Sequence, residues 1–326
     1  MIEILSGGAI NAVQDLGREG WQAIGVSRGG AMDAHALATA NAMVGNDDGA
    51  AGLEIALFPF RMQFRRDAYF ACTGARVSWK LGRLERTGWW AAPARAGDTL
   101  TLEMPQAGAR AYLAFSGGID VPCVLGSRAT DLKGGFGGYK GRGLRKGDLV
   151  PLADRERPRE RPVGTTSSVR SSFWEEAIAG CATVRVLPAA EYGEFTPEAR
   201  AAFEATEYRL TTDSNRQGYR LQGPELAMTA RRELLSHGIL PGTVQVPASG
   251  QPIIQLAEAN TCGGYPKIAN VIEADLWRLG QLRPGQRIRF ARTDHSSAVA
   301  ALAELAAEHA RIRDGLAFHS GHRRRQ

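Results

Sequence analysis

Gly117-Gly118-Ile119-Asp120-Val121-Pro122 is the first of two glycine-rich stretches that decide the fold. It runs on to GGFGG at 134–138, and its counterpart in the second half is TCGGYPK at 261–267. Each stretch follows a run that is typical of a buried strand, at 111–115 and at 252–256. Glycine permits sharp turns and close approach of other groups to the backbone. The chain therefore repeats one pattern, a buried strand followed by a glycine-rich loop, and we expect two related lobes.

Length and composition indicate a globular protein. The 326 residues are 44% hydrophobic and 23% charged, which suits one large domain or two medium ones. No apolar run is long enough to cross a membrane, and Met1-Ile2-Glu3-Ile4 does not resemble a signal peptide. The four cysteines are scattered, without a CxxC pair or a nearby histidine cluster. We therefore expect a cytoplasmic protein with no membrane contact, no metal site and no disulfide framework.

The formal net charge of +6 comes mainly from two short segments. Arginines alternate along a proline-rich segment at 155–161, and three more end the chain at 323–325. Without them the folded body is close to neutral. Because no basic stripe is interleaved with aromatic residues, we expect no nucleic-acid partner.

Strand patterns dominate the chain. Hydrophobic residues alternate at 60–64, 77–81 and 99–102, and Gly-Asp turns separate such runs. One helix stands out at 33–44, with Asp33 at its start and Gly45-Asn46 at its end. Short strands with regular turns favour a closed or sandwich-like β architecture.

The second half adds further helices and then returns to strands. We expect helices at 171–179, from Thr196-Pro197-Glu198 to 205, and at 294–312, the last docking through Leu302, Leu305, His309 and Ile312. The organisation that follows is an N-terminal lobe at 1–153, a Pro/Arg-rich linker and helix at 154–180, a C-terminal lobe at 181–292, and a C-terminal helix with a basic tail at 293–326.

The first candidate site in the N-terminal lobe lies near its start. Asp15 and Arg18 occur in one loop, and Asp33 opens the helix that follows. A helix N-terminus attracts a carboxylate or a phosphate. The alternative is structural: Asp15 and Arg18 pair to hold the loop, and Asp33 caps the helix.

A second candidate lies in the first glycine block. Arg128 and Asp131 precede 134–138, and Lys140 and Arg142 follow. Backbone N–H groups that glycine leaves accessible, together with these basic side chains, could bind an anion. The spacing is not that of a Walker A loop. A glycine-rich crossover loop is the alternative.

The C-terminal lobe offers two polar loops. Asn215 can donate and accept hydrogen bonds, and Arg216 can grip a carboxylate with two bonds; a plain polar turn is the alternative. In the loop 258–267, an acid, an amide, a hydroxyl and Lys267 stand together, and a Glu or Lys with a shifted pKa could transfer protons there. Cys262 is a weaker candidate, a nucleophile without a histidine nearby in the sequence.

These blocks together carry a resemblance. They read, in order, VQDLGREG (13–20), GAMD (30–33), AYLAFSGGIDVPCVLGSRATDLKGGFGGYKGRGLRKGD (111–148), TTDSNRQGYRLQGPEL (211–226) and ELLSHGILPGTVQVPASGQPIIQLAEANTCGGYPKIANVIEADLWRLGQLRPG (233–285). The chain resembles the biotin-dependent carboxyltransferase family, which includes allophanate hydrolase subunit 2, also called the 5-oxoprolinase C subunit. The resemblance covers nearly all of residues 1–292.

The resemblance implies a fold and an activity. It implies a mainly β protein of two cyclophilin-like β-barrel lobes, with a few short helices and a C-terminal amphipathic helix. It implies a hydrolase subunit that opens the lactam of 5-oxoproline to L-glutamate at the expense of ATP. The implied partners are a subunit-B-like protein (allophanate hydrolase subunit 1) and a third oxoprolinase subunit, which would share the ATP, while biotin is not carried on this chain.

The same resemblance implies site residues. As catalytic residues it indicates Asn215, Arg216 and Lys267. As substrate-binding residues it indicates Asp15, Arg18, Asp33, Arg128, Asp131, Tyr219, Thr261 and Tyr265. Either Arg128 or Arg216 would hold a substrate carboxylate, Asn215 or backbone N–H groups the carbonyl oxygen, and Lys267 a phosphate or carboxyl group. The chain departs from the family at 258–262, where EANTC stands in place of Asp-x-Gln-Thr-Thr.

Two other functions remain open on the sequence alone. The chain could be the carboxyltransferase component of a biotin-dependent urea or amide carboxylase, although it has no Met-Lys-Met carrier motif. It could also be a non-catalytic antagonist that binds a subunit-B-like inhibitor of a histidine kinase. Turnover, and not binding alone, separates these possibilities.

Overall fold

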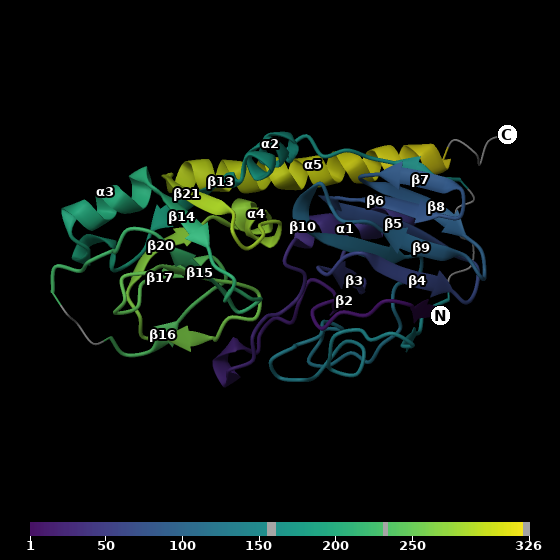
Figure 1. Ribbon diagram of the computed structural model, residues 1–326, viewed down its shortest axis with the longest axis horizontal. Helices are drawn as coiled ribbons and strands as arrows, with labels where there is room; N and C mark the ends of the chain where they lie inside the picture. Colours follow the sequence, from purple (N-terminus) through teal and green to yellow (C-terminus); the bar gives the residue numbers. More distant parts are fainter. Residues whose placement is uncertain (155–160, 231–233, 322–326) are drawn as a thin grey trace. The chain divides into compact units, whose positions relative to one another are not determined.

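The computed structural model describes residues 1–154, 161–230 and 234–321 (Figure 1). The chain divides into two compact units: the first consists of 1–18, 29–168 and 306–326, and the second of 19–28 and 169–305. Most of the Pro/Arg-rich linker expected from the sequence, at 155–160, and the last five residues of the basic tail lie outside the described residues.

Antiparallel strands build the first unit. Its strands are β1 (Ile2–Ile4), β2 (Ala12–Gln14), β3 (Gly52–Ile55), β4 (Phe60–Phe64), β5 (Ala68–Arg76), β6 (Ser78–Leu81), β7 (Leu84–Thr87), β8 (Trp90–Ala94), β9 (Thr99–Leu102), β10 (Ala107–Phe115), β11 (Leu149–Val150) and β12 (Val163–Gly164). They form two six-stranded sheets, β11-β1-β4-β9-β6-β7 and β12-β8-β5-β10-β3-β2. Phe60 and Trp79 from one sheet and Phe70 and Leu113 from the other belong to a single buried cluster. The two sheets therefore share one core.

The helix expected at 33–44 is confirmed as α1 (Ala34–Val44). Asp33 is its N-cap, because the Asp33 side chain accepts a hydrogen bond of 3.0 Å from the backbone N–H of Ala36. Gly45 ends the helix in the left-handed conformation, with φ of 76°. Residues 36–44 are all buried, so α1 is an internal part of the first unit.

The second unit is built on a closed barrel. Its helices and strands are α2 (Ser171–Ala179), β13 (Cys181–Pro188), α3 (Pro197–Ala205), β14 (Glu207–Leu210), β15 (Gly218–Gln222), β16 (His237–Gly238), β17 (Thr243–Gln245), β18 (Ile253–Gln255), β19 (Cys262–Gly263), β20 (Lys267–Val271), α4 (Leu276–Gly280) and β21 (Arg287–Arg292). The barrel order is β13-β20-β17-β18-β15-β14-β21. A parallel pairing of β13 with β21 closes it. The mainly β class predicted from the sequence is thus confirmed.

The described residues also form three short 3-10 helices, η1 (Gln22–Ile24), η2 (Tyr192–Glu194) and η3 (Glu273–Asp275). Aromatic packing fixes α3 on the barrel, because the rings of Phe203 and Phe290 stack with centroids 4.4 Å apart. Thr196 caps α3 through a hydrogen bond from Ala199, as the Thr-Pro-Glu start predicts.

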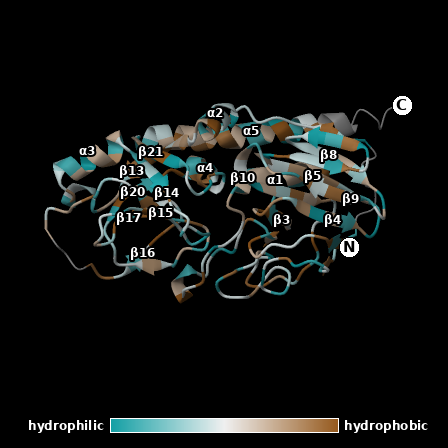
Figure 2. Cartoon of the chain, in the orientation of Figure 1, coloured by the Kyte–Doolittle hydropathy of each residue, from teal (hydrophilic) through white to brown (hydrophobic). Residues whose placement is uncertain are grey.

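The C-terminal helix α5 (His295–Gly321) is longer than the sequence pattern predicts. Ala301 packs on the second unit with Ile272, and Ile312 and Leu316 belong to a buried cluster of the first unit. Leu302, expected in the docking stripe, is 39% exposed. Figure 2 shows hydrophobic and hydrophilic residues interspersed along this helix. Among the described residues, no helix combines the length and apolar composition that crossing a bilayer requires.

In the glycine block at 134–138, two glycines share a left-handed backbone conformation but differ in how closely other atoms approach them. Gly135 and Gly137 both have φ of 69°, where an L-residue is strained by about 1–2 kcal/mol. A Cβ on Gly135 would meet nothing within 4 Å, but one on Gly137 would lie 2.2 Å from the Ala129 carbonyl oxygen. We expect Gly137→Ala to lower the free energy of unfolding more than Gly135→Ala, by about 1–3 kcal/mol. Urea titration measures both, and equal losses would contradict the packing of this block.

Candidate functional site

The predicted site residues of the first unit mainly build the glycine block. The Oδ1 of Asp15 accepts hydrogen bonds from Ser127 Oγ at 2.7 Å and from the N–H of Gly17 at 2.8 Å. Its Oδ2 accepts one from the N–H of Arg128 at 2.5 Å. The Asp131 carboxylate accepts a bond of 2.7 Å from the N–H of Gly134. Asp15 thus ties the loop at 15–18 to residues 127–128, and Asp131 holds the start of the glycine turn. Asp33 caps α1 as described above.

The two arginines of this group differ in exposure. Arg18 is 1% exposed; its Nη2 donates to the Ala129 carbonyl at 2.6 Å, and its guanidinium lies 4.8 Å from the Phe136 ring centroid. Its Nε and Nη1 are buried and have no hydrogen-bond partner among the described residues. Arg128 is exposed, and its Nε donates to the Val121 carbonyl at 2.9 Å. Arg128 is thus open to solvent, whereas Arg18 is enclosed.

In the second unit, a buried ion pair joins two predicted loops. The Nε of Arg216 donates to Glu258 Oε1 at 2.6 Å, and the side chains are only 6% and 3% exposed. The backbone N–H of Glu258 also donates to the Arg216 carbonyl, at 2.9 Å. Tyr219 lies next in β15, opposite Ile254 of β18, and is 3% exposed. Arg216 therefore clamps the loop that follows β18 to the start of β15.

A cavity of about 220 Å³ opens beside this clamp. Amide side chains predominate among the polar groups of its lining, which consists of Asp213, Asn215, Gln217, Gly218, Arg220, Ile239, Gln245, Ile253, Gln255, Asn260, Cys262, Gly263, Gly264 and Tyr265. Asn215 and Tyr265, two of the site residues proposed from the sequence, thus line the same cavity. Tyr265 is 52% exposed. We call this space the amide cavity.

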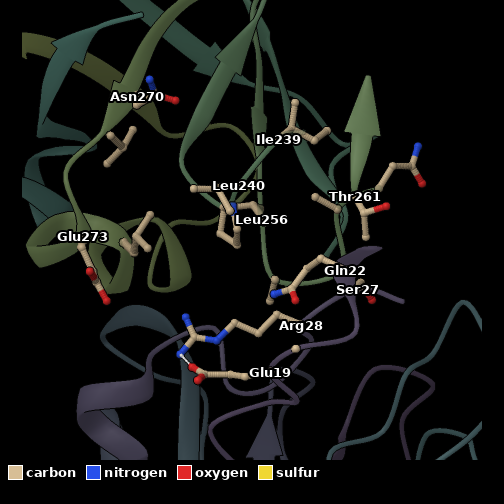
Figure 3. A pocket seen from close by; sticks show the side chains of 17 residues that line it. Glu19, Gln22, Ser27, Arg28, Ile239, Leu240, Leu256, Thr261, Asn270 and Glu273 are labelled. Atoms are coloured by element: carbon tan, nitrogen blue, oxygen red, sulfur yellow. Dashed lines mark ion pairs between the residues drawn. The ribbon is translucent and has the colours of Figure 1, made fainter. Parts of the chain in front are cut away.

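A larger cavity of about 510 Å³ adjoins it and shares Ile239 and Asn260 with it. Figure 3 shows Glu19 and Arg28 on one side of this cavity and Leu240 and Leu256 on the other. Glu19 and Arg28 form an ion pair of 3.2 Å. Thr261 lines this cavity. Its polar rim and apolar wall could accept a ligand that has both polar and apolar groups.

Lys267 lies at the start of β20, opposite Gln245 of β17. It is 6% exposed, and its Nζ is hydrogen-bonded to the Nε2 of His237. The Nδ1 of His237 lies 3.0 Å from the Leu235 carbonyl, which places the proton on Nδ1 and leaves Nε2 to accept. Burial lowers the pKa of Lys267, and the nearby Glu191 carboxylate opposes this shift.

The Lys267 amine could transfer a proton, because a lowered pKa leaves more of the amine unprotonated, and so able to accept a proton, near neutral pH. His237 and Glu191 were not predicted from the sequence. Glu191 Oε2 also accepts a hydrogen bond of 3.0 Å from the backbone N–H of Lys267. Among the described residues, no three His, Cys, Asp or Glu side chains are grouped so that they could hold a metal ion.

The Arg216–Glu258 pair predicts a marked loss of stability on truncation. Arg216→Ala leaves a buried carboxylate without its partner, and we expect a cost of about 3–5 kcal/mol in the free energy of unfolding. The double variant Arg216→Met with Glu258→Leu should cost less than this, because it buries no charge. Urea unfolding of the three proteins measures the difference. A loss below about 1 kcal/mol for Arg216→Ala would show that the pair does not clamp the loops.

The pKa of Lys267 predicts a pH dependence. Because the folded-state pKa is lowered, the unfolded chain binds more protons between the two pKa values, so this residue's contribution to stability rises with pH across that window. We expect the stability of the wild type relative to Lys267→Met to increase as the pH rises towards the ordinary lysine pKa. Carbon-13 NMR of the lysine Cε signals, assigned with that variant, gives the pKa directly. A Lys267 pKa at the ordinary lysine value would show that burial does not lower it.

Comparison with known proteins identifies relatives along most of the chain. Residues 24–292 match the family described as carboxyltransferase domain, subdomain A and B. The 5-oxoprolinase C subunit of Escherichia coli is 45% identical over 301 residues, covering 92% of this chain and 94% of that protein. The protein of the same name from Haemophilus influenzae is 39% identical, covering 89% and 90%. The urea amidolyase of Saccharomyces cerevisiae is 32% identical over 91% of this chain but only 17% of its own length.

Solved structures share the fold. The urea carboxylase of Kluyveromyces lactis superimposes with a TM-score of 0.85 at 28% identity over 97% of this chain, and the chain spans 29% of that protein. The protein TTHA0988 gives a TM-score of 0.78 at 33% identity over 89% of this chain, which spans about half (56%) of that protein. Together with the family match over 24–292, these likenesses show that the chain belongs to the carboxyltransferase domain, subdomain A and B, family.

Proposed function

We propose that this chain is the C subunit of a 5-oxoprolinase, a hydrolase that opens the lactam of 5-oxoproline to L-glutamate. The observation that carries the proposal is the near end-to-end alignment with the E. coli protein of that name, at 45% identity over 92% of this chain and 94% of that protein. The word subunit in both bacterial names supports an assembly of several different chains. We propose a subunit-B-like protein and a third oxoprolinase subunit as the partners.

The lactam is a stable amide, so its opening needs an energy source and groups that stabilise charge. We propose that ATP is the energy source, shared with the partner subunits. The developing oxyanion would be held by fixed N–H donors, for which Asn215 is the candidate. Its Oδ1 already accepts hydrogen bonds from the N–H groups of Gln217 and Gly218, at 2.8 and 3.4 Å, so its Nδ2 is left as the donor.

Proton transfer during lactam opening is assigned to Lys267 in this proposal. Its lowered pKa and its hydrogen bond to His237 support the role, because His237 reaches solvent with 43% of its side chain exposed. A proton taken by the amine could pass to the imidazole and out. Glu191, 3.9 Å from His237, would stabilise the charged imidazolium.

We propose roles for the other predicted residues that suit their surroundings. Arg18 keeps two buried donors without a partner among the described residues, which favours an anionic group from a ligand or partner. Arg128, being exposed, is available to bind an anionic group at the surface of the first unit. Arg216 is proposed as a positioning residue, because its Nε is engaged by Glu258. The substrate would be surrounded by Tyr219, Thr261 and Tyr265. The loops would be supported by Asp15, Asp33 and Asp131.

The carboxyltransferase alternative is less well supported. The chain aligns with only 17% of the S. cerevisiae urea amidolyase, so that name describes a protein whose greater part has no counterpart here. The sequence also contains no Met-Lys-Met motif for carrying biotin. We therefore propose that biotin is not carried on this chain.

Reconstitution tests the proposal. The chain is co-expressed with the two proposed partner subunits, and glutamate formed from 5-oxoproline is measured with and without ATP. We expect ATP-dependent glutamate, and a fall of about 100-fold or more in kcat for Lys267→Met. Lys80→Met, which changes an exposed lysine of β6 in the first unit, serves as the control and should retain activity.

Two results would contradict parts of this proposal. A reconstituted mixture that forms no glutamate, but carboxylates urea when a biotinylated carrier is supplied, would replace the function with the carboxyltransferase alternative. Full activity in Lys267→Met would remove the proton-transfer role from that lysine and leave the lactam hydrolase in place.

A further inference from the structure

The amide cavity has a buried donor that no described residue of the chain satisfies. Gln245, on β17, is 3% exposed, and its Oε1 accepts a hydrogen bond of 2.8 Å from the Nε2 of Gln255. Because this bond engages the Oε1 of Gln245, the Nε2 of the same amide points away from Gln255. Nε2 is buried and has no hydrogen-bond partner among the described residues. A buried amide N–H without an acceptor is costly, so its presence in a folded site points to an acceptor supplied from outside.

The backbone beside this donor is bare. Gly263 of β19 carries no side chain, and a Cβ placed there would lie 2.8 Å from the Nε2 of Gln245. Gly263 lines the amide cavity together with Gln245 and Gln255. A methyl group at this position would lie against the amide and occupy the space beside its Nε2.

The remaining lining selects the chemistry of the ligand. Asn215 presents its Nδ2, because its Oδ1 is taken by two backbone N–H groups. Arg220 is the cationic residue among those that line the cavity, and Asp213 is the acidic one. Neutral amide donors match a neutral carbonyl oxygen, and the guanidinium matches a carboxylate. The volume of about 220 Å³ suits a small metabolite.

We propose that the amide cavity binds a small carboxylated cyclic amide, with its carbonyl oxygen accepting from Gln245 Nε2 and its carboxylate facing Arg220. Naming 5-oxoproline as that ligand rests on the proposed function. The ligand class itself follows from the donors that line the cavity. Gln245 is then a residue that binds and orients the lactam carbonyl.

The chain contains its own reporter for this binding. Cys262 is exposed and lines the amide cavity, whereas Cys123 is exposed in the first unit. The full chain is alkylated with iodoacetamide, alone and in the reconstituted complex, and the modification of each cysteine is followed by mass spectrometry. We expect 5-oxoproline to slow alkylation of Cys262 and to leave Cys123 unchanged.

Three probes separate the two halves of the ligand. 2-Pyrrolidinone has the lactam carbonyl without the carboxylate, and L-proline has the carboxylate without the carbonyl. We expect protection by 5-oxoproline at the lowest concentration, weaker protection by 2-pyrrolidinone, and the weakest by L-proline. Equal protection by L-proline and 5-oxoproline, or none by any probe, would overturn the assignment.

Two variants test the donor and the space separately. Gln245→Glu keeps the shape and the bond from Gln255 but replaces the free N–H with an oxygen; we expect 5-oxoproline to protect about tenfold less well. Gly263→Ala should weaken protection by filling the space. Gly238→Ala is its matched control, since a Cβ on that neighbouring glycine of β16 meets nothing within 4 Å. Thermal melting confirms that each variant is folded. Wild-type protection in both folded Gln245→Glu and Gly263→Ala would refute the proposal.

The same measurements separate this inference from the proposed function. Protection of Cys262 by 5-oxoproline and 2-pyrrolidinone, lost in Gln245→Glu, supports the cavity even if the reconstituted complex forms no glutamate. An active complex in which Gln245→Glu leaves both KM and Cys262 protection unchanged supports the function and overturns the cavity.

Discussion

The parallel pairing of β13 with β21 is the constraint on which the second unit depends. Residues 181–186 run alongside 287–292, joining the first and last strands of this region, while the other neighbours in the barrel pair in antiparallel fashion. A closed barrel has no free edge, so its strands hold their register firmly. The loops that enter β15 and β20 and the loop that leaves β18 are therefore held at fixed positions. Side chains from 213–220 and 253–265 line one cavity because of this closure.

The polar residues fall into two classes once their contacts are known. Asp15, Asp33, Asp131 and the Arg216–Glu258 pair have their charges or lone pairs engaged by nearby groups, so they hold loops in shape. Lys267 and Gln245 differ, because one has a lowered pKa and the other a donor without an acceptor among the described residues. A free donor or a shifted pKa inside a folded protein has a cost, and function is a common reason to keep it.

Local patterns predicted much of this structure. The helix at 171–179 and the capped start at Thr196 have the expected bounds, because caps and prolines act within one turn. The mainly β class followed from alternation and turns. In the first unit the strands form two sheets around one core, whereas the closed barrel lies in the second unit; closure depends on pairing between distant strands, which a local pattern does not encode.

The site was harder to predict for the same reason. His237 reaches Lys267 across 30 residues. Gln245 of β17 lies beside Gly263 of β19, although β19 pairs with β16 and not with β17. Segment 19–28 belongs to the second compact unit although its neighbours in sequence belong to the first. The sequence suggested Arg128 or Arg216 for a substrate carboxylate, but it did not indicate that the Nε of Arg216 meets Glu258, which lies 42 residues away. Which of several plausible partners a charge meets is decided by tertiary register.

Hydrogen exchange in the reconstituted complex tests the central claim most directly, namely that the barrel loops of the second unit hold the lactam. Exchange is compared with and without 5-oxoproline, in the absence of ATP so that the ligand stays intact. The account predicts slower exchange at 213–220, 243–245 and 253–265. Slower exchange confined to the glycine block at 126–142, with these barrel segments unchanged, would contradict it.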